Sequence, residues 1–256
     1  MVFLASAQKI NISPAIMRFD ATPGEPVSQR LLILNNGDKS QILRLYVGDW
    51  FRDPNGGHVY LPVNSVKETC SSWISLSHDL IEVPAMNSVE VIVTLDAPAG
   101  YQSDSMKWAM VFLLGVVEKE DPLSPDNTLS TTIEESFQFG VHVYNTPENL
   151  TETSAKAIDM VPLESQNAIQ LQVQNSGLTQ LRGTAYLEFV NLETGEEFNS
   201  EEIEAPIFPG YSRHFNLPVP EKLPEGEYSV LGLFDYGDTF PLAGYETTYT
   251  HTKAIE

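Results

Sequence analysis

The side chains that could act as metal ligands or nucleophiles are scattered along this sequence of 256 residues. None of the five histidines has a second His or a carboxylate at the spacing of a zinc motif: His58, His78, His142, His214 and His251. The single cysteine, Cys70, has no His close in sequence, which favours a small buried residue over a nucleophile. The sequence therefore predicts no metal, no cofactor and no catalytic residue, and the chain is expected not to be an enzyme.

Carboxylate pairs are common because the chain has 35 Asp and Glu residues against 14 Lys and Arg. Asp49 with Asp53, or Asp235 with Asp238, could bind Ca²⁺ between loops. Neither pair has the alternating oxygen ligands of a dedicated site, so we expect a solvated surface instead. Trp50 and Phe51 flank a turn and could stack on a sugar, although most of the large aromatic residues are expected to fill cores.

The net charge of -21 bears on the partners of the molecule. A field of this sign repels phosphate backbones and anionic lipid head groups, so nucleic acid is not expected as a partner. No stretch of the chain approaches the roughly 18 to 20 apolar residues that a membrane span needs, so membrane insertion is not expected either.

The first residues resemble the end of a secretory signal peptide. A short apolar segment precedes Ala5-Ser6-Ala7, which satisfies the small-x-small cleavage rule. We interpret residues 1–7 as a signal-peptide remnant of a truncated reading frame, with a mature chain that begins near Gln8. An ordinary flexible N-terminus is the alternative. The remnant predicts a periplasmic or otherwise extracytoplasmic location.

The elements that must position any functional residue are predicted to be strands, because period-two runs bounded by turn residues recur along the chain. In residues 88–95, for example, Val89, Val91 and Val93 share one face while Glu90 and Thr94 lie on the other. Nowhere does a helical period persist. The pattern predicts an all-β protein made of two immunoglobulin-like β-sandwich domains in tandem, residues 8–147 and 148–256.

The expected strands of the first domain are residues 9–12, 16–20, 27–35, 41–50, 58–63, 73–77, 80–83, 88–95, 107–117 and 136–144. A polar loop is expected over residues 118–135, and a linker over residues 147–160, where alternation lapses. The expected strands of the second domain are residues 168–174, 180–192, 197–204, 212–217, 226–235 and 245–252.

The first 147 residues resemble a known family through a succession of short motifs. These are Ile12-Ser-Pro14, Pro23-Gly24, the strand that ends in Asn35-Asn36, Ser72-Trp-Ile74, Pro84 and Trp108-Ala-Met-Val-Phe112. Their order and spacing resemble the first domain of the PapD-like periplasmic pilus chaperones, and a second sandwich of about a hundred residues is also the layout of that family.

The resemblance implies a partner-binding strand. In that family the last strand of the first domain presents alternate apolar side chains to an unfolded pilus subunit and completes its sheet by β-strand addition. The matching residues on one face here are Phe137, Phe139, Val141 and Val143. The same alternation also fits a strand that packs its own domain's core, and both interpretations stay open.

The family also holds the subunit's terminal carboxylate with two basic residues, one on the first strand and one on the last. Here Lys9 and Arg18 are the only candidates near the first strand, neither at the aligned position, and residues 136–144 contain no Lys or Arg. The predicted function is that of a non-catalytic periplasmic chaperone-like or assembly protein that binds secreted or pilus-type subunits. The alternatives are a structural or adhesive surface protein without a client, and a glycan-binding accessory domain.

Overall fold

The computed structural model describes residues 9–101, 104–118, 134–237 and 239–252. The expected signal-peptide remnant, most of the expected polar loop and Asp238 lie outside these residues. Contacts within the chain define two compact units. The first comprises Met1–Trp50, Tyr60–Ser103 and Lys107–Glu148, and the second comprises Phe51–Val59, Asp104–Met106 and Asn149–Glu256.

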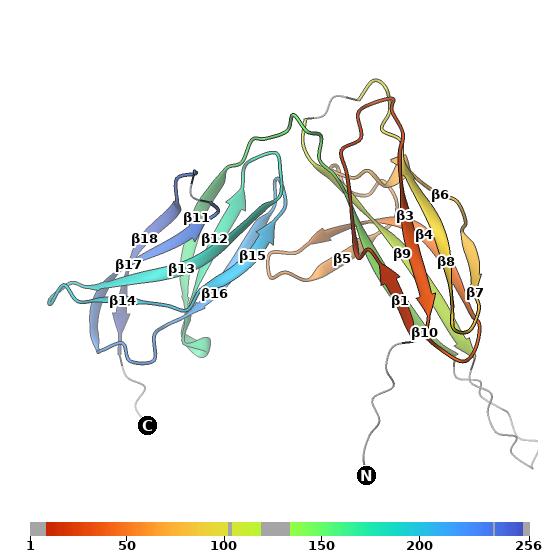
Figure 1. Ribbon diagram of the computed structural model, residues 1–256. Helices are drawn as coiled ribbons and strands as arrows, with labels where there is room; N and C mark the ends of the chain where they lie inside the picture. Colours follow the sequence, from red (N-terminus) through yellow and green to blue (C-terminus); the bar gives the residue numbers. More distant parts are fainter. Residues whose placement is uncertain (1–8, 102–103, 119–133, 238, 253–256) are drawn as a thin grey trace, which may run out of the picture. The chain divides into compact units, whose positions relative to one another are not determined.

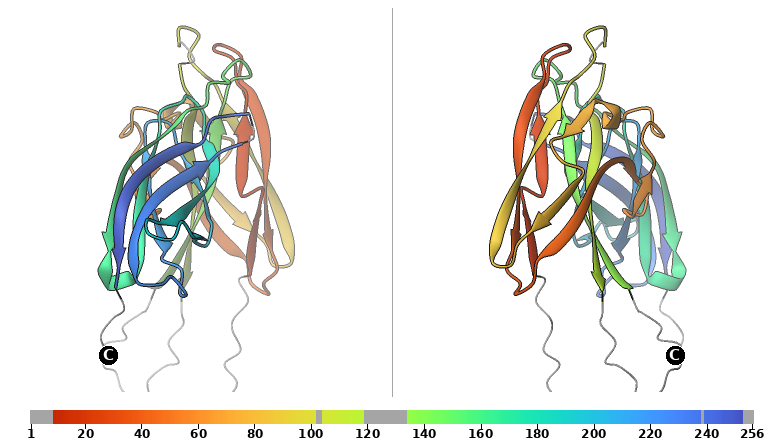
Figure 2. Two further views of the ribbon diagram at one scale, coloured as in Figure 1. Left: turned by 90° about the vertical axis from the view of Figure 1, so that its left-hand side faces the viewer. Right: turned by 90° about the vertical axis from the view of Figure 1, so that its right-hand side faces the viewer.

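Strands build the first unit, although the last two residues of β4 and the first two of β5 belong to the second unit (Figures 1 and 2). They are β1 (Ile10–Ser13), β2 (Ile16–Phe19), β3 (Val27–Asn35), β4 (Gln41–Arg52), β5 (His58–Leu61), β6 (Ile74–Leu76), β7 (Leu80–Val83), β8 (Asn87–Leu95), β9 (Lys107–Glu118) and β10 (Glu134–Asn145). A short 3₁₀ helix, Ser71–Trp73, precedes β6.

Two sheets face each other in this unit. One has the strand order β1-β3-β8-β6, and the other has the order β2-β10-β9-β4-β5, with β7 also paired to β4. The chain passes from the first sheet to the second between β1 and β2, at the cis peptide bond Ser13–Pro14. Each sheet therefore ends, on this side, in one of the two N-terminal strands.

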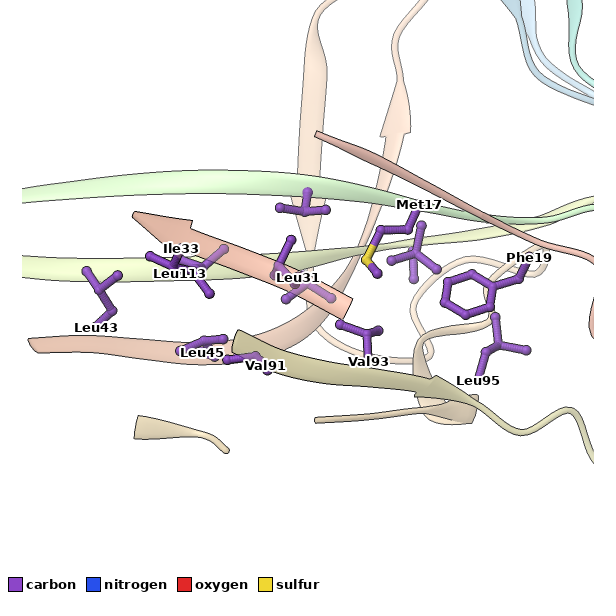
Figure 3. Packing of buried hydrophobic residues seen from close by; sticks show 14 of the residues in the cluster. Met17, Phe19, Leu31, Ile33, Leu43, Leu45, Val91, Val93, Leu95 and Leu113 are labelled. Atoms are coloured by element: carbon purple, nitrogen blue, oxygen red, sulfur yellow. The ribbon is translucent and has the colours of Figure 1, made fainter. Parts of the chain in front are cut away.

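The core of the first unit lies between the two sheets. Along β3, Leu31 and Ile33 are fully buried while Arg30 and Leu32 are exposed, which is the alternation expected of a strand with one buried face. Figure 3 shows side chains from β2, β3, β4, β8 and β9 meeting in this layer. They include Met17, Phe19, Leu43, Leu45, Val91, Val93, Leu95 and Leu113.

The second unit is also a pair of sheets. Its strands are β11 (Ala155–Leu163), β12 (Ala168–Asn175), β13 (Leu181–Asn191), β14 (Glu197–Asn199), β15 (Ile203–Ile207), β16 (Ser212–Pro218), β17 (Gly226–Asp235) and β18 (Ala243–His251), with a 3₁₀ turn at Glu164–Gln166. One sheet has the order β11-β12-β16, and the other has the order β14-β13-β17-β18, with β15 paired to β13. The prediction of two immunoglobulin-like β-sandwiches is confirmed.

Two expectations about the second sandwich were wrong. The expected linker contains the start of β11, whose pairing with β12 is interrupted by a bulge between Ala157 and Asp159. A bulge adds one residue to the strand and shifts its alternation, which hid the strand from the period-two search. The single strand expected over residues 197–204 is two strands, β14 and β15, which pair with different parts of β13.

Candidate functional site

The strand β10 has one complete neighbour and one partial neighbour. It pairs antiparallel with β9 along its whole length, from Glu134 opposite Glu118 to Asn145 opposite Lys107. On its other side, β2 pairs with it in parallel only from His142 to Asn145. Within the described part of the chain, no strand lies beside the first half of β10 on that side.

The direction of the backbone groups on this free edge follows from two hydrogen bonds. The N–H of His142 donates to the carbonyl oxygen of Ala15 at 3.1 Å, and the N–H of Thr146 donates to that of Phe19 at 2.9 Å. Because backbone groups alternate along a strand, even-numbered residues direct their N–H and C=O toward the edge. Ser136, Gln138 and Gly140 therefore present backbone donors and acceptors there, and odd-numbered residues bond to β9. We call residues 136–140 of β10 the free edge.

The four apolar residues predicted to bind a partner divide into two pairs. Val141 and Val143 are 1% and 0% exposed and belong to the core of the first sandwich. A partner cannot reach these side chains in the folded chain, so both are removed from the candidate contact residues. Phe137 and Phe139 are half-buried and pack against the margin of the same core.

Phe137 occupies space that a glycine leaves open. Its register partner on β9 is Gly115, and a Cβ placed on Gly115 would lie 2.2 Å from the Cζ atom of Phe137. The ring of Phe137 also meets that of Phe139 edge-on, with centroids 5.4 Å apart. Phe137 and Phe139 thus form an aromatic pair beside the free edge, seated on Gly115.

The opposite face of β10 carries polar and aromatic residues. Gln138 and Gly140 are exposed, and Tyr144 is buried. The side chain of Met110 lies over Gly140, since a Cβ at that glycine would lie 2.4 Å from the Met110 Sδ atom. The imidazole of His142 lies against Trp50, with ring centroids 4.6 Å apart.

The structure does not bring Lys9 and Arg18 together as a carboxylate clamp. The Lys9 Nζ atom donates to an Asp38 carboxylate oxygen at 2.9 Å, and this hydrogen bond lowers the pKa of Asp38 below its ordinary value. Arg18 lies on β2 in the other sheet, with its guanidinium carbon 5.3 Å from the centroid of the Tyr144 ring. Each cation therefore has a local partner of its own.

A basic residue that sequence reasoning missed is Lys107, the first residue of β9. It is only 5% exposed, its Nζ atom lies 5.5 Å from the centroid of the Tyr101 ring, and its register partner is Asn145 of β10. Its place at the start of a strongly apolar strand is the one signal that could have singled it out.

Asp49 was expected to lie on a solvated acidic surface, and this expectation is wrong. Its carboxylate is fully buried and accepts hydrogen bonds from the backbone N–H groups of Ser65 and Val66, at 2.6 and 2.9 Å, and from the Thr69 hydroxyl. These bonds hold the segment between β5 and β6 against the sheet. A carboxylate used in this way is a structural anchor.

The structure also shows where the predicted sugar-stacking residues and the single cysteine lie. Trp50 is fully buried, so it cannot form an exposed sugar platform with Phe51. Cys70 is a free, buried cysteine, and burial raises the pKa of its thiol. Among the described residues, no three His, Cys, Asp or Glu side chains gather in a way that could hold a metal ion. The same residues contain no helix long and apolar enough to cross a membrane.

Searches with protein-family models and among curated proteins gave no match. Solved structures do match. A chain from a chaperone–tip adhesin complex of CFA/I fimbriae biogenesis has a TM-score of 0.52 at 11% identity, over 94% of this chain and 98% of that chain. A chain from the CsuC–CsuE chaperone–tip adhesion subunit pre-assembly complex of the archaic chaperone–usher Csu pili of Acinetobacter baumannii has a TM-score of 0.51 at 11% identity, over 93% and 98%.

The YadV chaperone also has a TM-score of 0.51 at 11% identity, over 95% of this chain and 100% of that one. These matches span both sandwiches, although about nine residues in ten differ. The order of the strands and their division into two sandwiches is therefore what is shared. The protein has the two-sandwich fold of the fimbrial chaperones.

Proposed function

We propose that this chain is a non-catalytic, periplasmic chaperone-like assembly protein that binds secreted or pilus-type subunits by β-strand addition at the free edge of β10. Its two domains would be residues 8–147 and 148–256. The partner is a protein, and the binding needs no cofactor, nucleic acid or membrane insertion.

The observation that carries the proposal is that no described strand pairs with the backbone groups that Ser136, Gln138 and Gly140 direct away from β9. A strand edge with free N–H and C=O groups is a template for another strand, and proteins usually cover or disrupt such an edge. Here Ser136, Gln138 and Gly140 direct these groups away from β9. An incoming strand could pair with this part of β10 in the position that β2 occupies from His142 onward.

Side chains beside the free edge support the same proposal. Phe137 and Phe139 form a half-buried aromatic pair, which can extend a partner's apolar core at the point where the strand joins. The fold is that of chaperones, two of them solved in complexes with a tip adhesin or a tip adhesion subunit. Val141 and Val143 hold the strand to its own sandwich.

One substitution can remove the edge without touching the ladder to β9. Gln138→Pro deletes an N–H that points to the free edge, and proline is tolerated on an edge strand where its N–H would face away from the sheet. Gln138→Ala is the matched control, because it also removes the Gln138 side chain but keeps the N–H. Both variants are expected to unfold cooperatively, with the proline variant less stable by a modest amount.

The test is the set of subunits that co-purifies with each form from the extracytoplasmic extract of the native host, quantified by mass spectrometry. Wild type and Gln138→Ala are expected to retain the same subunits, and Gln138→Pro is expected to lose them. Equal recovery with a folded Gln138→Pro would refute strand addition at this edge. Recovery of no subunit with any form would favour a structural or adhesive protein without a client.

A further inference from the structure

A second exposed surface lies on the outer face of the β10-β9-β4 sheet. Along β4, the buried residues Leu43 and Leu45 alternate with Ile42, Arg44 and Tyr46, which therefore point away from the core. In the neighbouring strand β7, Leu80 is the register partner of Arg44 and also points outward. These residues come from adjacent strands and share one face.

Aromatic rings continue this face toward β9 and β5. Tyr46 stacks on Phe112 of β9, with ring centroids 5.0 Å apart, and Tyr60 of β5 meets the same Phe112 ring edge-on at 5.2 Å. Gly48 makes room for Phe112, because a Cβ there would lie 2.9 Å from the ring. The two tyrosines thus flank a buried phenylalanine that holds both in place.

Four large apolar or aromatic side chains on this face are exposed to solvent. Tyr46 is 39% exposed, Tyr60 53%, Ile42 59% and Leu80 61%. We call Ile42, Arg44, Tyr46, Tyr60 and Leu80 the outer patch. Large exposed apolar side chains that gather in one place mark interaction surfaces more often than single ones do. Tyr and Arg are also the residues enriched among the strongest contributors to protein–protein binding.

Two opposite charges lie on this face. Glu82, the register partner of Ile42, is exposed and accepts a hydrogen bond from the Ser40 hydroxyl at 2.6 Å. Arg44 is also exposed, and among the residues that the structure describes no carboxylate forms an ion pair with it. Two other exposed arginines have such partners: Arg30 lies 3.7 Å from a Glu90 oxygen, and Arg182 lies 2.7 Å from a Glu204 oxygen. A positive centre framed by apolar side chains is complementary to a carboxylate framed in the same way.

We propose that the outer patch binds a protein segment that places one carboxylate among apolar side chains. The site is distinct from the backbone groups of the free edge and adds a second point of contact. A second copy of this chain is a poor occupant, because two molecules that each carry a net charge of -21 repel each other. The same net charge repels anionic lipid surfaces.

The test begins with a random peptide library displayed on phage and selected on the full chain. Peptides that bind wild type but not the Tyr46→Ala/Tyr60→Ala double variant are expected to contain two or more large apolar residues and one Asp or Glu. The most enriched of these is then synthesised with a fluorophore, and its dissociation constant is measured by fluorescence anisotropy. Replacing its acidic residue with Lys is expected to weaken binding at least tenfold.

Charge reversal on the protein gives the decisive result. Arg44→Glu is expected to weaken binding of the acidic peptide at least tenfold and to restore binding of the Lys-substituted peptide. Arg30→Glu on the other sheet is the matched control, because it changes the net charge by the same amount, and it is expected to change both constants less than threefold.

Several outcomes would overturn the proposal. If Arg44→Glu and Arg30→Glu weaken peptide binding equally, the effect comes from the net charge of the protein and not from a contact with Arg44. If every selected peptide also binds the Tyr46→Ala/Tyr60→Ala variant, the patch does not bind peptides. If wild type is a dimer and the double variant a monomer, the patch is a contact between two copies of the chain. If wild type binds anionic vesicles and the double variant does not, the patch binds lipid. Gln138→Pro and its control Gln138→Ala both remove the Gln138 oxygen that accepts from the Tyr46 hydroxyl at 3.3 Å, and only the proline variant removes the N–H of the free edge. Failure of strand addition is therefore read from the difference between these two variants, and failure here from the Arg44→Glu and tyrosine variants.

Discussion

Asn35 and Asn175 make the same three hydrogen bonds in the two sandwiches. The Asn35 Nδ2 atom donates to the carbonyl oxygens of Lys39 and Val83 at 2.8 and 3.0 Å, and its Oδ1 atom accepts from the N–H of Gly37 at 2.8 Å. The same atoms of Asn175 bond to Thr179, Ile207 and Gly177 at 2.8, 2.9 and 2.9 Å. Both side chains are fully buried, and each ends a strand and closes the turn after it.

Asn35→Ala and Asn175→Ala are each expected to lower the free energy of unfolding of their own sandwich by about 1–3 kcal/mol, because buried carbonyl groups lose their donor. Urea denaturation followed by fluorescence and circular dichroism gives this free energy. Asn36→Ala changes the exposed neighbour of Asn35 and should cost less than about 0.5 kcal/mol. Equal costs at positions 35 and 36 would contradict the proposed role.

Gly115→Ala is expected to destabilise the chain by about 1–3 kcal/mol, because the added methyl group would overlap the Phe137 ring. A double-mutant cycle isolates this contact. In a Phe137→Ala background the ring is absent, so Gly115→Ala should cost much less. Additive costs in the two backgrounds would show that the ring and the glycine do not interact.

Cys70 is expected to be inert in the native protein. Burial, and secondarily the nearby negative charge of Asp49, raise the pKa of its thiol, so the reactive thiolate is scarce at neutral pH. A chromogenic disulfide reagent at pH 8 should react with it only after urea is added. Ser72→Cys, at an exposed neighbouring position, should react at once in a Cys70→Ala background. Prompt labelling of native Cys70 would contradict its burial.

His58 is expected to titrate below its ordinary value. Partial burial, and secondarily the positive charge of Arg52, whose Nη2 atom lies 3.2 Å from the imidazole Nε2, lower the pKa of His58. The native state then binds fewer protons than the unfolded state. Stability from neutral His58 is present above the unfolded pKa of about 6.5 and is lost as the pH falls through the folded pKa.

The NMR titration of the His58 ring protons measures this pKa directly. Arg52→Gln should move the midpoint upward, because it removes the second cause. His58→Gln should flatten the dependence of unfolding free energy on pH below about 6.5. A His58 midpoint at or above that of the unfolded chain would contradict the assignment.

Regular alternation was enough to locate most strands. The expected strand 27–35 coincides with β3, and the expected strand 226–235 coincides with β17, because burial alternates along most of each strand. β11 escaped detection because most of its residues are exposed and its bulge shifts the pattern. Its Pro162 also reads as a break, although proline is compatible with an edge strand such as this one.

The candidate site was harder to predict than the fold. Periodicity shows which residues of β10 share a face, but both Phe137 and Val143 satisfy it, and only the neighbouring sheet makes Val143 part of the core. Which half of β10 lacks a neighbour depends on where β2 stops, a long-range pairing that no local pattern encodes. The partners of Lys9 and Asp49 are likewise set by tertiary contacts.

The alternation of backbone groups along β10 affects which amino-acid substitutions this strand can accept during evolution. The residues that face the open side contribute amide and carbonyl groups common to almost every amino acid, whereas the odd-numbered side chains must still fit the sandwich. Selection acting on recognition would therefore exclude little more than proline at positions 136 and 138, whereas Met110 also limits the side chain at position 140. Related proteins could therefore keep this main-chain binding edge while the residues that face it differ in sequence.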